Sequence, residues 1–94
     1  MTESNIQASI INWLKSEFWL VFKTVKVTPN GFPDVIAFRN GVTILIEVKT
    51  PTGRVSSVQT EQHRRLRLED IPTLVTNSLT DFKEQLNESK ILNR

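Results

Sequence analysis

The sequence contains no cysteine and only one histidine, His63. Without cysteine the chain forms no disulfide and offers no thiolate to a metal, and one histidine is too few for a multi-histidine zinc site. No apolar run approaches the ~20 residues that a membrane-spanning helix needs. We therefore expect neither a disulfide framework, nor a structural zinc site, nor a membrane partner.

The chain is also short and carries little net charge. Its 94 residues provide for one modest hydrophobic core, so we expect a single domain over residues 1–94. A formal net charge of +2 does not identify a nucleic-acid-binding protein by itself, and the distribution of charge must decide. The start of the chain, 1–4, lacks the basic residues of a signal peptide, and we expect a cytoplasmic protein.

A β-hairpin is the strongest local prediction. Segments 34–39 and 43–49 are rich in β-branched and aromatic residues, and Asn40-Gly41 between them is typical of a two-residue hairpin turn. Opposite residues in such a hairpin have a constant index sum. This register places Asp34 beside Glu47.

Periodicity predicts the remaining elements. Apolar residues recur at helical spacing near both ends of the chain, and β-branched runs mark two further strands. We expect a compact α/β domain, a mixed four-stranded sheet flanked by helices in the order α-β-β-β-α-β-α. Outside the hairpin, the predicted elements are a helix over 3–18, a strand over 20–27, a helix to about 69 that begins with a capping box at Ser56, a strand over 73–76, and a helix capped by Asn77 or Ser78, with fraying at Asn93 and Arg94.

Three charged side chains converge in this arrangement. Glu47 and Lys49 are two positions apart on a strand and point to the same face, and Asp34 lies opposite Glu47. Two carboxylates this close repel each other unless a cation lies between them, and oxygen ligands of this kind suit Mg²⁺ or Mn²⁺. Lys49 would then lie next to an attacking water as a general base or electrostatic stabiliser, although a surface lysine paired with Glu47 is the alternative. Divalent-metal phosphoryl chemistry follows from this set.

The motifs around these residues resemble a known nuclease superfamily. The runs Gly31-Phe32-Pro33-Asp34 and Ile46-Glu47-Val48-Lys49, followed by Ser56-x-x-Gln59, resemble the PD-(D/E)XK nucleases, and more narrowly the small stand-alone VRR-NUC (virus-type replication-repair nuclease) domains. The similarity extends from Glu3 to about Leu66. It implies a restriction-endonuclease-like core and Mg²⁺ as cofactor, replaceable by Mn²⁺, without a small-molecule cofactor.

The resemblance also assigns further site residues. It implies that the backbone carbonyl of Val48 joins Asp34 and Glu47 as a metal ligand, that Glu3 assists near the metal, and that Gln59 contacts the catalytic water or a phosphate. Two of these side chains have structural alternatives. Gln59 completes the capping box of Ser56, and Glu3 complements the dipole of its helix.

Basic side chains gather just before and on the predicted second helix. The bland interpretation is a solvated basic face, but beside the carboxylate motif we favour phosphate binding. For the histidine, an ordinary exposed position is equally acceptable. The candidates for DNA contacts are Arg54, His63, Arg64, Arg65 and Arg67.

These observations predict a metal-dependent endonuclease that acts on DNA. The resemblance implies structure-selective cleavage in DNA repair or recombination, with four-way (Holliday) junctions as the leading substrate. Because a junction has two symmetric cut sites, we expect a homodimer with Phe18, Trp19 and Phe22 as interface candidates. One alternative is a restriction-type nuclease that reads a duplex sequence, but this chain has almost no insertion that could enter a major groove and contact the bases. The other alternative is a non-catalytic DNA-binding module on the same fold, and the intact set of Asp34, Glu47 and Lys49 argues against it.

Overall fold

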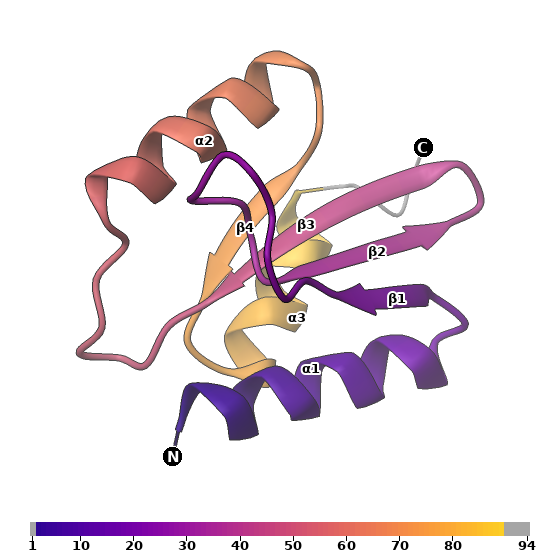
Figure 1. The fold of residues 1–94 in the computed structure, drawn as a ribbon. Helices are drawn as coiled ribbons and strands as arrows, with labels where there is room; N and C mark the ends of the chain where they lie inside the picture. The colour runs from indigo at the N-terminus through magenta and orange to yellow at the C-terminus, as the bar shows by residue number, and fades with distance from the viewer. Residues whose placement is uncertain (1, 90–94) are drawn as a thin grey trace.

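A four-stranded mixed sheet with the strand order β1-β2-β3-β4 forms the centre of the structure, a computed structural model that describes residues 2–89 (Figure 1). The predicted order α-β-β-β-α-β-α is confirmed. Within the described range, no helix is long and apolar enough to cross a membrane. Asn93 and Arg94, for which fraying is predicted, lie outside that range. The elements are α1 (Glu3–Ser16), β1 (Leu20–Lys23), β2 (Val35–Arg39), β3 (Val42–Val48), α2 (Ser57–Leu68), β4 (Thr73–Thr76) and α3 (Leu79–Glu88).

The β2–β3 hairpin has the predicted turn and register. Asn40 and Gly41 both adopt positive φ angles, 50° and 80°, as a type I′ turn requires. The strands pair antiparallel, with Val35 opposite Ile46. The next position on each strand is Asp34 and Glu47, so the register directs both carboxylates to one end of the hairpin.

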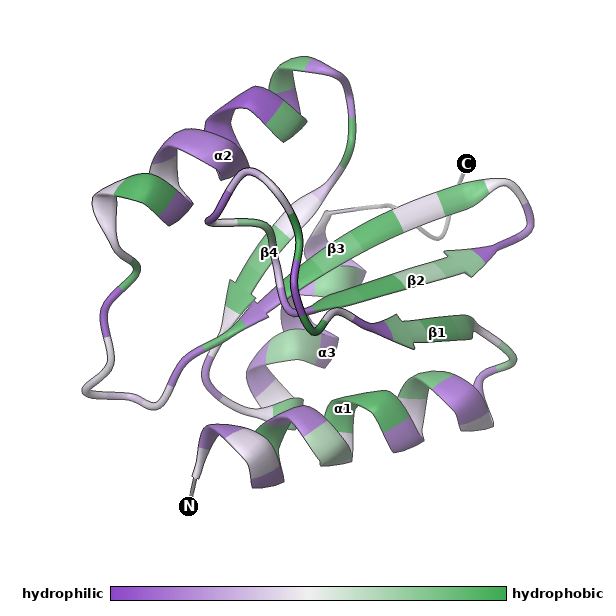
Figure 2. Cartoon of the chain, viewed as in Figure 1, coloured by the Kyte–Doolittle hydropathy of each residue, from purple (hydrophilic) through white to green (hydrophobic). Residues whose placement is uncertain are grey.

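One face of the sheet carries the hydrophobic core. Helices α1 and α3 contact each other and bury Ile10, Leu14, Phe82 and Leu86 against the strands. Figure 2 shows the same division, because the strands are mostly hydrophobic and α2 is mostly hydrophilic. Helix α2 belongs to the connection between β3 and its parallel neighbour β4, and it lies outside this core. The hydrophobic core therefore lies on one face of the sheet, and α2 is a polar helix outside it.

Strand β1 is shorter than predicted. It ends at Lys23, whereas the pattern extended to Val27. Beyond it, the Thr24 N–H donates to the Asp34 carbonyl oxygen at 2.8 Å, and the Thr24 hydroxyl donates to the Pro33 carbonyl oxygen at 2.8 Å. After Thr24 the chain bends and leaves the sheet. The loop between β1 and β2 thus begins beside Asp34.

Trp19 is wrongly predicted as an interface residue, because it belongs to the core. Its side chain is 4% exposed, and the Arg39 guanidinium lies 4.6 Å from the centre of its ring. The other two candidates are on the surface, with Phe18 88% and Phe22 52% exposed. Phe18 has a φ of 67°, which ends the preceding helix before this residue.

Candidate active site

Asp34 and Glu47 lie side by side where β2 begins and β3 ends. The Val48 backbone N–H donates to Asp34 Oδ2 at 3.0 Å, which fixes the Asp34 carboxylate against β3. Glu47 is only 1% exposed, and both of its neighbours on the strand are buried apolar residues. A carboxylate in this position is costly to bury unless it is neutralised by a proton or a cation.

The charge of Glu47 is unfavourable at this place. Burial and the neighbouring carboxylate of Asp34 together raise the pKa of Glu47 to about 8, with a smaller contribution from Glu3. Lys49 opposes this shift. A divalent cation between the two carboxylates would offset the cost of the buried charge, so Asp34 and Glu47 fit the metal that the motif implies.

The chain supplies few further ligands. Residues 2–89 contain no group of three or more Asp, Glu or His side chains that could hold a metal. The N–H and C=O groups of one strand residue point to the same side of the strand. Because the Val48 N–H points to Asp34, the Val48 carbonyl oxygen also lies on the side of Asp34 and could be a third metal ligand. Two carboxylates, with backbone and water completing the shell, are typical of Mg²⁺ sites.

Lys49 follows β3 directly and lies at the predicted place. Its backbone N–H donates to the Thr76 carbonyl oxygen at 2.9 Å, which ties the end of β3 to β4. Its ammonium group is near enough to lower the pKa of Glu47. A polar cavity of about 310 Å³ borders Lys49 and is also lined by Asn77, Asp81 and Gln85, but not by Asp34 or Glu47.

His63 requires a correction, because it is neither exposed nor free to contact a DNA phosphate. It is 2% exposed, and its Nε2 atom lies 3.5 Å from Glu47 Oε1. Burial lowers the pKa of His63, and the charge of Arg67 lowers it further. The structure thus adds the imidazole to the carboxylate site. In the sequence, His63 shares a helical face with Gln59 and Gln62, and this polar pattern does not distinguish a buried position from an exposed one.

Gln59 and Glu3 both lie in the first turn of a helix, as the alternatives of a capping residue and a charge on the helix dipole predict. The Ser56 N–H donates to Gln59 Oε1 at 2.9 Å, and the Gln59 N–H donates to Ser56 Oγ at 3.1 Å, so the capping box is confirmed. Glu3 begins α1 at the end of the sheet where β3 ends (Figure 1), near enough to raise the pKa of Glu47. Contacts of either side chain with a substrate remain predictions.

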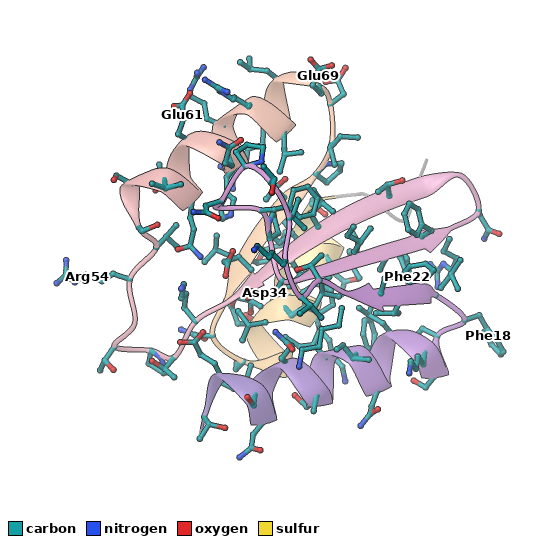
Figure 3. All side chains as sticks on the ribbon, viewed as in Figure 1. Phe18, Phe22, Asp34, Arg54, Glu61 and Glu69 are labelled. Carbon is teal, nitrogen blue, oxygen red and sulfur yellow. The ribbon has the colours of Figure 1, made fainter. Side chains whose placement is uncertain are left out.

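The arginines are less free than the sequence indicates. Glu61 binds both Arg64, at 2.6 Å, and Arg65, at 3.1 Å. Arg67 donates from Nη2 to the Thr73 carbonyl oxygen at 2.8 Å and so attaches α2 to β4. Only Arg54 has no partner within the described residues, and Figure 3 shows it extending outward from the loop between β3 and α2. Among the four, Arg54 is the most available for a phosphate.

Gly31 controls how closely α2 approaches the site. It has a φ of +96°, and a Cβ atom there would lie 2.9 Å from the Val58 carbonyl oxygen on α2. Side chains do not tolerate such a contact with backbone, so only glycine lets the β1–β2 loop pass this near to the helix. The same approach brings His63 to Glu47.

We expect Gly31→Ala to destabilise the protein and displace α2. Strain at positive φ costs about 1 kcal/mol, and the clash with Val58 adds to it. Gly41→Ala is the matched control, because Gly41 has a φ of +80° but no atom within 4 Å of the added Cβ. Urea unfolding should show a clearly larger loss for Gly31→Ala. Equal losses would mean that the close approach is unimportant.

Comparison with known proteins agrees with this fold. The model of the VRR-NUC domain family matches residues 1–79. A solved structure described as a VRR-NUC domain superposes with a TM-score of 0.82 at 21% identity, covering 93% of this chain and 97% of its own. A second, described as a VRR-NUC domain protein, has a TM-score of 0.77 at 17% identity and covers 98% and 90%, respectively. No curated protein matches the chain.

Proposed function

The chain belongs to the VRR-NUC domain family, whose members are nuclease-like and bind DNA, and from this premise we propose that it is a metal-dependent endonuclease that hydrolyses DNA phosphodiester bonds. One observation carries the proposal. The buried Glu47 carboxyl lies beside the carboxylate of Asp34, so two acidic groups share a site that is largely closed to water. A cation is the simplest group that makes this arrangement favourable in the ionised state.

Each residue of the site has a proposed task. Asp34, Glu47 and the Val48 carbonyl would hold Mg²⁺, for which Mn²⁺ substitutes. The ion, when bound, neutralises charge that develops on the phosphate oxygens. Lys49 orients the attacking water and accepts its proton or stabilises its charge. Glu3 and Gln59 hydrogen-bond to the water molecules around the ion. Gln59 does so when substrate binds, by giving up its hydrogen bond with the Ser56 N–H.

Arg54 binds a phosphate of the substrate strand in this proposal. Its guanidinium extends from the loop that follows Lys49 and has no intramolecular partner within the described residues. Arg64 and Arg65 share Glu61 and exchange that carboxylate for phosphate only at some cost. The proposed contact surface therefore runs from Arg54 to the exposed side of α2.

Lys49→Ala should lose most of the cleavage rate yet keep its affinity for Mn²⁺. The reason is that the lysine acts on the water and the transition state, whereas Asp34 and Glu47 hold the cation. We expect a loss of about 100-fold or more, the usual range for a general base. Lys49→Arg retains the charge without an accessible neutral form, so it separates a base from an electrostatic stabiliser. Lys15→Ala, which changes an exposed lysine on α1, is the control.

Lost Mn²⁺ binding in Lys49→Ala, measured by calorimetry, would contradict this division of tasks. It would make Lys49 mainly the structural partner of Glu47.

We further propose that the protein is a homodimer that prefers branched DNA. Strand β1 is an edge strand of the sheet, and apolar side chains are exposed on and beside it. Phe22 is 52% exposed and packs edge-to-face on Phe38, with ring centres 6.1 Å apart, and Leu20 is 59% exposed opposite Phe38. An unpaired edge with an apolar surface favours association with a second copy. Two copies related by a twofold axis would present two active sites to a junction.

The test combines assembly with substrate choice. Sedimentation should give about twice the chain mass of 10.8 kDa, and Mg²⁺-dependent cleavage should be faster on a four-way junction than on linear duplex of the same sequence. Phe22→Glu should yield a monomer that has lost the junction preference. Leu68→Glu, which places the same charge at a 70% exposed position on α2, should behave as wild type.

A monomeric wild-type protein that cuts junctions and linear duplex equally would contradict the dimer and the substrate class. Binding of DNA with no cleavage in Mg²⁺ or Mn²⁺ would instead favour a non-catalytic DNA-binding module.

A further inference from the structure

The only fully buried residue of α2 is its histidine. The helix is polar on most of its surface, and two of its three apolar residues, Val58 and Leu68, are 50% and 70% exposed, while Leu66 is partly buried. A helix that covers a protein interior normally buries leucine, isoleucine or valine. Here the inward position holds an imidazole that faces a carboxylate. Packing alone does not account for this choice of residue.

The two buried groups have no alternative partners. Neither His63 Nε2 nor Glu47 Oε1 has a hydrogen bond to any described residue, and the two atoms are 3.5 Å apart. A buried donor or acceptor without a partner costs about 1–3 kcal/mol. A small adjustment of either side chain forms an N–H···O bond from the imidazole to the carboxylate and satisfies both atoms. His63 Nε2 and Glu47 Oε1 can therefore satisfy each other's hydrogen-bonding needs.

We propose that His63 is a positioning residue that holds one oxygen of Glu47 by a hydrogen bond from Nε2 and directs the other oxygen toward Asp34 and the cation. The inference rests on the proposed function for the cation, but the His63–Glu47 bond does not depend on it. The Asp34 carboxylate is close enough to the Glu47 side chain to raise its pKa, so the second Glu47 oxygen lies on the side of Asp34.

The surroundings of His63 keep the imidazole in place. Arg67, one turn further along α2, donates to the Thr73 carbonyl oxygen at 2.8 Å and fixes the helix to β4. On the other side, the loop at Gly31 contacts α2 at the Val58 carbonyl. With the helix attached at both ends of the site, the ring has little freedom to turn away from Glu47. Groups that orient a metal ligand in this manner typically change metal affinity 10- to 100-fold when removed.

Mn²⁺ titration by calorimetry, without DNA, tests the inference on the whole chain. His63→Leu fills the same space without a donor and should bind Mn²⁺ about 10- to 100-fold more weakly than wild type. His63→Gln retains an N–H donor and should recover most of the affinity. Leu66→Ala, which loosens the packing of α2 one turn away, should leave the affinity unchanged. Equal affinities for wild type and His63→Leu would overturn the proposal.

A second measurement separates this inference from the proposed function. In EDTA, the unfolding midpoints of wild type, His63→Leu, Glu47→Gln and the double variant form a double-mutant cycle. A non-additive cycle supports the His63–Glu47 bond, and an additive one overturns it, whether or not metal binds. A wild-type protein that binds no Mn²⁺ would refute the metal-dependent function, and the cycle alone would then decide whether His63 holds Glu47.

Discussion

Asp34→Asn and Glu47→Gln should each abolish Mg²⁺-dependent cleavage while the chain remains folded. Each substitution removes a charged ligand of the proposed cation, and losing several kcal/mol of transition-state stabilisation corresponds to about a thousandfold or more in rate. Neither removes much packing. Asn at position 34 retains an acceptor for the Val48 N–H, and Gln at position 47 has the shape of a protonated glutamate.

The controls for this pair change exposed residues with the same chemistry. Asp70 has a φ of 60°, which asparagine also tolerates, so Asp70→Asn matches Asp34→Asn. Glu84→Gln on α3 matches Glu47→Gln. Both controls should cleave DNA as wild type does. Calorimetry should show weakened Mn²⁺ binding only in the two site variants. Full turnover by either of them, or by the wild type in excess EDTA, would refute the metal-dependent mechanism.

The pairing of Asp34 with Glu47 was predictable because it depends on local rules. An Asn-Gly turn fixes the register of a two-residue hairpin, and the register fixes which side chains lie opposite each other. The capping box at Ser56 was predictable for the same reason, since its donors and acceptors are all within four residues. Such contacts need no knowledge of the tertiary structure.

The role of His63 was not predictable, because it depends on a contact between distant parts of the chain. Nothing near position 63 distinguishes a buried histidine from an exposed one on a polar helix. The deciding contact is with Glu47 on β3, which the crossover connection brings next to α2. The burial of Trp19 likewise depends on packing against the core and on Arg39. Residues whose surroundings come from other elements are those for which sequence patterns give least information.

The length of β1 illustrates a third case, in which the signal was present in the sequence. Residues 24–27 continue an apolar, β-branched run, which favoured a longer strand. However, a strand needs an extended partner, and the segment before β2 turns at Gly31, which has a φ of +96°. Propensity was therefore outweighed by the conformation of the partner segment.

The metal-free protein should become less stable as the pH rises from 6.5 to 8. Burial and the adjacent Asp34 raise the pKa of Glu47 from 4.5 to about 8. Between these values the folded protein holds a proton at Glu47 that the unfolded chain has released, so the free energy of unfolding falls with increasing pH. Over the interval from 6.5 to 8 the loss should be about 2 kcal/mol.

The other shifted groups act mainly at lower pH. The pKa of His63 is lowered from 6.5 in the folded state, so the folded protein binds fewer protons than the unfolded chain around and below that pH, and stability falls there on acidification, opposite in sign to the effect of Glu47. Paired with Arg64 and Arg65, Glu61 has its pKa lowered to about 2, and its contribution is lost only as the pH falls below 4.5. Glu47 is therefore the group that the interval from 6.5 to 8 reports.

Urea unfolding in EDTA at several pH values measures this slope. Glu47→Gln carries no ionisable group at this position and should remove most of the pH dependence, whereas Glu84→Gln should keep the wild-type slope. Mg²⁺ added at pH 8 should restore the lost stability, because a cation binds the ionised carboxylate and takes the place of the proton. A wild-type protein whose stability is flat between pH 6.5 and 8 in EDTA would show that Glu47 is ionised without a cation. The burial of Glu47 would then give no support to a cation site.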